Sequence, residues 1–77
     1  MPRTLFKPVG HDTLVPIRCT ASGREEFSTY EAYYRAREAC RRGTAEFCLV
    51  IDQGQILARF ESLGNGEVRQ TEGKEIL

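Results

Sequence analysis

One segment of this chain carries both a start signal and a stop signal for a helix. Ser28 and Glu31 fit a capping box, in which the serine oxygen accepts a hydrogen bond from the third helical amide and the glutamate reaches back to the cap. Phe27 stands at the staple position just before the cap. Gly43 follows two arginines, and a cationic last turn before a residue that is free to adopt a positive φ is typical of a helix end. These signals predict one helix over residues 29–42.

The predicted helix has an apolar face and a charged face. At 100° per residue, one stripe holds the small and apolar side chains that would pack closely on a sheet: Ala32, Tyr33, Ala36, Ala39 and Cys40. On another side, two glutamates each stand four residues before an arginine, as Glu31–Arg35 and Glu38–Arg42. Pairs in this order stabilise a helix by about 0.3–0.5 kcal/mol each and indicate a solvated face.

Two strands joined by a tight turn are expected after the helix. Residues 46–52 are largely apolar and alternate in side-chain direction, and residues 53–54 (Gln-Gly) supply a two-residue hairpin turn before residues 55–61 return. The turn fixes the register as Asp52 opposite Gln55, Ile51 opposite Ile56, Leu49 opposite Ala58 and Phe47 opposite Phe60. We therefore expect this face to form the core under the helix.

The flanking segments are less regular. Residues 14–20 predict a strand at a sheet edge, because Pro16 has no amide hydrogen to donate, and residues 24–27 predict a short return strand. Two prolines and a glycine indicate an irregular arm over residues 1–12. Residues 67–71 fit a further strand.

The expected architecture is α+β: an antiparallel sheet of four or five strands in the order β-β-α-β-β(-β), with one helix packed on one face. The chain is expected to be a single small domain, 1–77, with its core over residues 14–71 and a loose tail over residues 72–77. A domain of this length has room for one thin core, because it buries only about 60–65% of the surface that its unfolded chain exposes.

Charge and cysteine content limit the expected partners. Eleven basic residues balance eleven acidic ones, and a net charge near zero removes the usual case for nucleic acid or an anionic membrane as the main partner. No stretch approaches the ~20 apolar residues that span a bilayer. Three cysteines at irregular spacing fit neither a disulfide framework nor a zinc site, so we expect reduced thiols in a soluble, cytoplasmic protein.

Several short segments carry a resemblance to a known family. They are Ser28–Ala32, Ala36–Ala39, Glu46–Val50, Gln53–Ile56 and Glu61–Gly64. Together they resemble a family of short bacterial domains of unknown function, in which one hairpin precedes the helix and a second one follows it. The family has no assigned activity, so the resemblance implies a hairpin–helix–hairpin layout and no particular function.

No set of residues offers a catalytic or metal-binding constellation. His11 is the only histidine and stands beside Asp12 in the N-terminal arm, and nothing in the spacing holds either residue against Cys19. No pair of Cys, His or Asp has chelating spacing with a second pair to match it, and no glycine-rich turn opens a helix. We therefore predict no enzyme activity, no cofactor and no metal.

Two surfaces are candidates for interaction. The helix carries a stripe of aromatic and cationic residues, of the types that protein interfaces favour: Tyr30, Tyr34, Arg37 and Arg41. In the alternative interpretation, these tyrosines cover the sheet edge and the arginines solvate the helix. The sheet face away from the helix is open to a second copy, and is predicted to present Val50 opposite Leu57 and Cys48 opposite Arg59.

The expected function is a small non-catalytic protein-interaction module: an adaptor, regulator or inhibitor of the kind that bacteria and phages encode. Its expected partner is another protein, with a homodimer as a further option. The alternative is an accessory RNA- or DNA-binding domain that uses the arginines of the helix, Arg35, Arg37, Arg41 and Arg42. Binding that weakens steeply with salt would distinguish this alternative.

Overall fold

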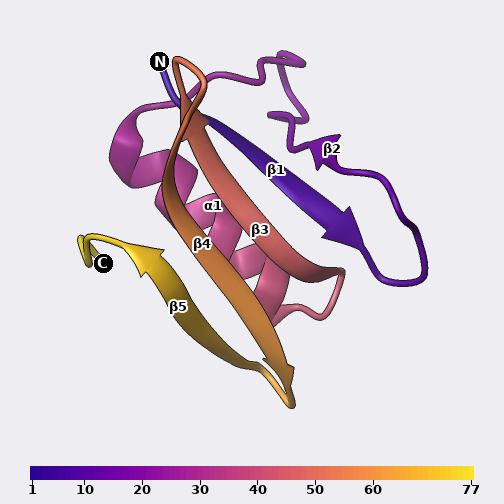
Figure 1. Cartoon of the computed structure of the whole chain (residues 1–77). Coiled ribbons are helices and arrows are strands. Elements are labelled where there is room, and N and C mark those ends of the chain that lie inside the picture. The colour runs from indigo at the N-terminus through magenta and orange to yellow at the C-terminus, as the bar shows by residue number, and fades with distance from the viewer.

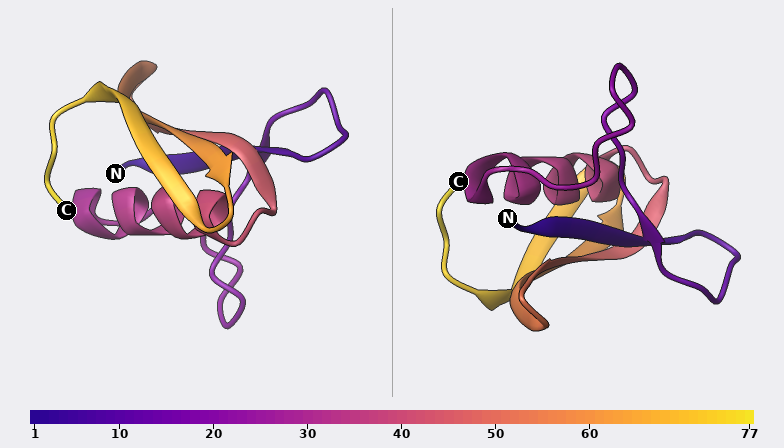
Figure 2. Two further views of the ribbon diagram at one scale, coloured as in Figure 1. Left: turned by 90° about the horizontal axis from the view of Figure 1, so that it is seen from below. Right: turned by 90° about the horizontal axis from the view of Figure 1, so that it is seen from above.

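An antiparallel sheet of five strands carries one helix on one of its faces, which confirms the predicted α+β class (Figure 1). The computed structural model describes residues 1–77. The strand order in the sheet is β2-β1-β3-β4-β5. In chain order the elements are β1 (Arg3–Pro8), β2 (Val15–Pro16), α1 (Thr29–Arg41), β3 (Ala45–Asp52), β4 (Gln55–Gly64) and β5 (Glu67–Gly73). The other face of the sheet has no helix over it (Figure 2).

Helix α1 begins and ends where its local signals predict. The Ser28 side chain accepts a hydrogen bond from the Glu31 amide at 3.2 Å, and Gly43 follows the last turn at φ +80°. The second half of the capping box does not form, because the Glu31 carboxylate pairs with Arg35 at 3.0 Å. Phe27 is buried before the cap, with the Arg35 guanidinium 4.4 Å from its ring centre. With 13 residues, α1 falls short of the length that a membrane-spanning helix needs.

The N-terminal segment is a strand of the sheet, so the expectation of an irregular arm over residues 1–12 is wrong. β1 lies between β2 and β3, and its Thr4 and Phe6 side chains face the helix. Thr4 is fully buried, and its hydroxyl donates a hydrogen bond to the Ala32 carbonyl of α1 at 2.8 Å. One proline precedes this strand and Pro8 ends it. At the ends of a strand, the amide hydrogen that a proline lacks does not interrupt the hydrogen bonds to neighbouring strands.

The strands predicted between β1 and the helix are shorter than expected. Residues 14–20 contribute only the two-residue strand β2 at the sheet edge, and residues 24–27 contribute a single bridge between Glu26 and Arg3. At the other end of the chain, β5 is present and extends to Gly73, inside the segment expected to be a loose tail.

A β-bulge in the β3–β4 hairpin decides which side chains face the helix. Next to the turn the register is as predicted, with Ile51 opposite Ile56. The following pair is Val50 with Ala58, so Leu57 is an extra residue on β4. Every pair farther from the turn is therefore displaced by one residue from the predicted register.

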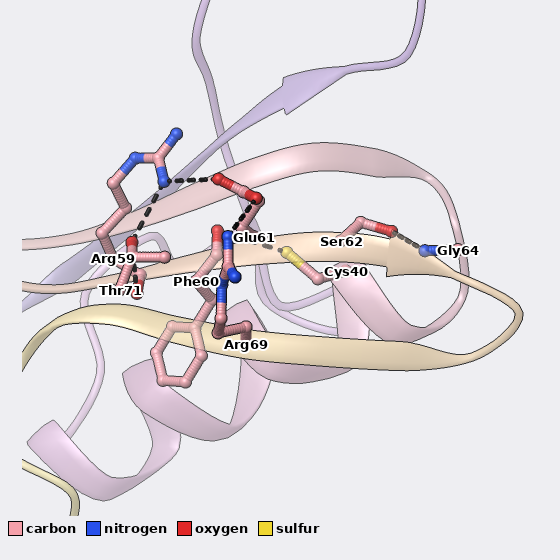
Figure 3. Close-up of polar contacts among 8 residues, drawn as sticks. All are labelled: Cys40, Arg59, Phe60, Glu61, Ser62, Gly64, Arg69 and Thr71. Atoms are coloured by element: carbon pink, nitrogen blue, oxygen red, sulfur yellow. Dashed lines mark hydrogen bonds and ion pairs between the residues drawn. The ribbon is translucent and has the colours of Figure 1, made fainter.

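This displacement reverses the predicted core face. Phe60 pairs with Cys48 rather than with Phe47, and its ring points toward the helix (Figure 3). Four side chains of the hairpin are buried beneath α1: Cys48, Val50, Ala58 and Phe60. The expectation that Phe47, Leu49 and Ile51 form the core is wrong, because they are half-buried on the opposite face. Since β3 is apolar on both faces, alternation alone does not distinguish them.

Candidate functional site

A groove lies between α1 and the β2 edge of the sheet. The helix packs on β1, β3, β4 and β5, but none of its Cα atoms comes within 8 Å of a Cα atom of β2. The space left beside the helix has a volume of about 770 Å³. Its apolar lining consists of Phe6 from β1, Val15, Pro16 and Ile17 at β2, and Tyr34 and Ala39 from α1. A concavity of this size with an apolar lining is typical of ligand-binding sites.

Charged residues also line the groove. Three arginines and two glutamates contribute to the lining: Arg18, Glu31, Arg35, Glu38 and Arg42. Glu31 and Arg35 pair with each other at 3.0 Å. Arg18 donates to Glu25 outside the groove at 2.8 Å, and this hydrogen bond lowers the pKa of the Glu25 carboxyl. Most of these charges are therefore neutralised by partners within the chain.

The Glu38 carboxylate does not pair with Arg42, contrary to the predicted i,i+4 pair. Its Oε2 atom lies 3.5 Å from a guanidinium nitrogen of Arg41 and 3.8 Å from one of Arg37. These two arginines compete for the same carboxylate, which is mostly buried. Arg42 is left on the rim of the groove without an ion pair.

The predicted Tyr/Arg stripe is divided by the groove. Tyr34 lines the groove and is 44% exposed, whereas Tyr30 is 61% exposed and lies outside it. The Arg37 guanidinium lies 5.7 Å from the Tyr34 ring centre. Arg41 is half-exposed beside Glu38 and does not line the groove. The structure therefore connects Tyr34, Arg37 and Arg41, and Tyr30 takes no part in these contacts.

The residues proposed for self-association do not share one exposed face. Cys48 and Val50 are fully buried under α1, so the prediction that they lie on the open face is wrong. Leu57 is the bulge residue and packs against the core, where its carbonyl accepts a hydrogen bond from the Tyr33 hydroxyl at 3.1 Å. Of the four, only Arg59 lies on the open face. The bulge is the physical reason for this change.

Charged side chains cover part of the open sheet face. The Arg59 guanidinium lies 4.6 Å from the Phe47 ring centre, and donates to Glu61 at 3.1 Å and to Thr71 at 3.0 Å (Figure 3). Glu61 also accepts a hydrogen bond from Arg69 at 3.0 Å. This network shields apolar surface of β3 from water, so the open face is a weaker candidate for binding than the groove.

The Arg59–Glu61–Arg69 network makes stability depend on pH. The hydrogen bond from Arg59 and the attraction of Arg69 lower the pKa of the Glu61 carboxyl below its ordinary value of 4.5. A carboxyl whose pKa falls on folding stabilises the native state at pH values above its ordinary pKa. This contribution is lost as the pH falls through the pKa of the folded state. We expect Glu61→Gln to lower the free energy of unfolding at about pH 7 and to leave it unchanged at about pH 2. Urea unfolding of both proteins measures this, and an equal loss at both pH values would contradict it.

The residues considered for catalysis lie on exposed loops. His11 and Asp12 are exposed between β1 and β2. Cys19 is half-buried after β2, where the hydroxyl of Ser22, with the amides of Ser22 and Ala21, lowers the pKa of its thiol to about 7. No hydrogen bond joins these three candidates to one another. Groups of three or more His, Cys, Asp or Glu side chains with the geometry to hold a metal ion are absent.

Two buried thiols connect the helix to the sheet. The sulfur atoms of Cys40 in α1 and Cys48 in β3 are 3.7 Å apart, and that of Cys40 also lies 3.6 Å from the Phe60 carbonyl oxygen. The contact with Cys40 and burial raise the pKa of the Cys48 thiol. Both side chains therefore act as small core residues, which the helical pattern predicts for Cys40 but the strand pattern does not predict for Cys48.

Comparisons with protein-family models, with curated proteins and with solved structures find no match for this chain. The resemblance to short bacterial domains therefore stays a prediction. The geometry of the groove is therefore the feature that bears on function, because a fold by itself does not specify one.

Sequence reasoning identified Tyr34 but missed the opposite wall of the groove. The pattern over residues 14–20 predicts a full edge strand with Val15 and Ile17 on one of its faces, whereas the strand covers two residues and Val15 is 37% exposed. The edge position that Pro16 predicts is correct, but the length of the strand is not. An edge strand that continues for only two residues leaves its neighbours free to line a groove.

Proposed function

We propose that this protein is a small non-catalytic protein-interaction module that binds a segment of another protein in the groove between α1 and β2. The observation that carries the proposal is the groove itself, a concavity beside the helix whose lining combines apolar and charged side chains. Protein-binding surfaces likewise combine apolar area with polar and charged groups. Tyr34 supplies an exposed aromatic side chain on the wall, of the kind that dominates binding energy at interfaces.

Nucleic-acid binding by the helix has weaker support. Three of its four arginines are held by carboxylates of the same helix, namely Arg35 by Glu31, and Arg37 and Arg41 by Glu38. Such an arginine has to share or release its carboxylate before it neutralises a phosphate, and the carboxylate itself repels a polyanion. We therefore put protein binding forward as the function.

Replacement of Tyr34 by alanine tests this proposal. Tyr34→Ala removes exposed aromatic surface from the groove wall and leaves the buried core intact, so we expect partner binding to weaken about tenfold or more. The measurement is quantitative mass spectrometry of proteins captured by the immobilised chain from a lysate of its source cells. Tyr30→Ala is the matched control, because Tyr30 lies on the same helix outside the groove, and it should capture the same partner as the wild type.

Two results would overturn the proposal. Undiminished capture by a folded Tyr34→Ala protein would place the binding surface outside the groove. Retention of oligonucleotides that falls steeply with salt, without any specific protein partner, would favour the nucleic-acid function instead. Circular dichroism of each variant verifies that the fold is intact, and a solution mass measurement on the same samples reports self-association.

A further inference from the structure

Arg42 is the only arginine of the chain that has no ion pair. Every other arginine lies within ion-pair distance of a carboxylate. Arg42 is exposed and lies on the rim of the groove, at the C-terminal end of α1. A free guanidinium offers a planar set of donors that suits a carboxylate. The groove therefore contains one cationic position that the chain itself does not neutralise.

The acidic residues of the groove are already engaged. Glu38 is shared by Arg37 and Arg41. Glu31 is held by Arg35 at 3.0 Å and lies 3.8 Å from Arg24. Neither carboxylate can move to Arg42 without leaving another arginine unpaired. The groove itself therefore supplies no free carboxylate to pair with Arg42.

The rest of the groove sets the remaining requirements for its occupant. Phe6, Val15 and Ile17 present apolar surface in the same groove as Arg42. We propose that the occupant is an extended peptide segment of a partner protein, with apolar side chains that pack on this lining and one acidic side chain that pairs with Arg42. This inference rests on the proposed protein-binding function, and it adds the chemistry of the partner.

The charges of the groove favour a peptide over a polyanion. One free arginine matches one acidic side chain, whereas a run of phosphates would also meet the carboxylates of Glu31 and Glu38. The apolar lining offers nothing to a phosphate backbone, but it buries aliphatic side chains favourably. A peptide supplies both kinds of group within a few residues.

Selection from a phage-displayed library of short random peptides on the immobilised full chain tests the inference. We expect the enriched peptides to share an Asp or Glu next to Leu, Ile, Val, Phe or Met. A synthetic copy of an enriched peptide should bind Arg42→Glu about tenfold more weakly by fluorescence anisotropy, because repulsion replaces attraction. A second selection on Arg42→Glu should enrich Lys or Arg in place of the acidic residue.

Arg41→Glu is the matched control for this substitution. It makes the same change of charge in the same helical turn, but Arg41 lies outside the groove and already pairs with Glu38. We expect it to change peptide affinity by about twofold or less, because an exposed charge outside the site contributes little. If Arg42→Glu disturbs the circular dichroism spectrum, Arg42→Gln replaces it, with an expected weakening of about threefold.

The outcomes separate this inference from the function on which it rests. Peptides that lack an acidic residue, or that bind the Arg42 variants as tightly as the wild type, would overturn the inference. The absence of any enrichment over a bare surface would overturn it as well. In both cases partner capture that depends on Tyr34 would still support the protein-binding function. If partner capture does not depend on Tyr34 and peptide binding does not depend on Arg42, both proposals are rejected.

Discussion

Truncation of Phe60 to alanine is expected to remove a large part of the stability of this protein. Phe60 is 3% exposed beneath α1, and its ring meets Tyr33 edge-on at a centroid distance of 5.8 Å. Loss of a buried phenylalanine costs about 3–5 kcal/mol, because apolar contact is lost and a cavity remains. At roughly 0.05–0.15 kcal/mol per residue, a chain of this length has about 4–12 kcal/mol to lose. We therefore expect a large fall in the urea midpoint of Phe60→Ala. If the total free energy of unfolding lies at the lower end of that range, much of the variant should be unfolded in buffer without urea.

Phe47→Ala is the matched control for this prediction. The two phenylalanines are predicted from the sequence to face each other in the core, but Phe47 lies on the open face under the Arg59 guanidinium. Its truncation removes partly solvated contacts and one cation–π contact, so we expect a loss of only about 1–2 kcal/mol. Urea unfolding of both variants measures the difference. Equal losses would contradict the face assignment and the bulge that produces it.

The elements that depend on local signals are predictable from this sequence. The helix is fixed by Ser28 at its start and Gly43 at its end, and both signals act within a few residues of the backbone they cap. The turn that follows β3 is local as well, since Gln53 and Gly54 both adopt the positive φ that a tight hairpin turn requires. The register next to this turn is accordingly correct.

The core face is not predictable in this way, because it depends on contacts between distant elements. The extra residue Leu57 is stabilised by Tyr33 of α1, whose hydroxyl donates to the Leu57 carbonyl. Neither alternation within β3 nor the turn residues contain that information. The same holds for β1, which is recognised as a strand only through its pairing with β3 and the hydrogen bond from Thr4 to the helix.

The residues of the groove also differ in whether local signals or contacts between distant elements place them. Tyr34 is predictable, since helical spacing alone places it beside the apolar face. Phe6 and Val15 are not, because they line the groove opposite α1 only after β1 enters the sheet. The free charge of Arg42 is not predicted by the i,i+4 rule, which pairs it with Glu38, because Glu38 pairs instead with Arg37 and Arg41 of the same helix.

Replacement of Gly73 by alanine is expected to destabilise the edge of the sheet strongly. Gly73 ends β5 opposite Ala58, at the bulge of β4, with φ +94°. A Cβ atom there would lie 2.0 Å from the Leu57 carbonyl oxygen and 2.8 Å from the Ala58 Cα atom. Both are backbone atoms, so neither can rotate away. We expect a loss of about 2–4 kcal/mol, in which backbone strain of about 1–2 kcal/mol adds to the clash.

Gly10→Ala separates the two contributions. Gly10 has a similar φ of +82°, but no atom lies within 4 Å of the place where its Cβ would be built. This variant carries the backbone strain without the clash, so we expect a loss of about 1 kcal/mol. Urea unfolding gives both losses, and hydrogen exchange of the β4–β5 amides should show faster opening only in Gly73→Ala, because an edge strand relieves a clash by separating from its neighbour. Equal destabilisation, or unchanged exchange along β4, would mean that β5 does not pack against the bulge in solution.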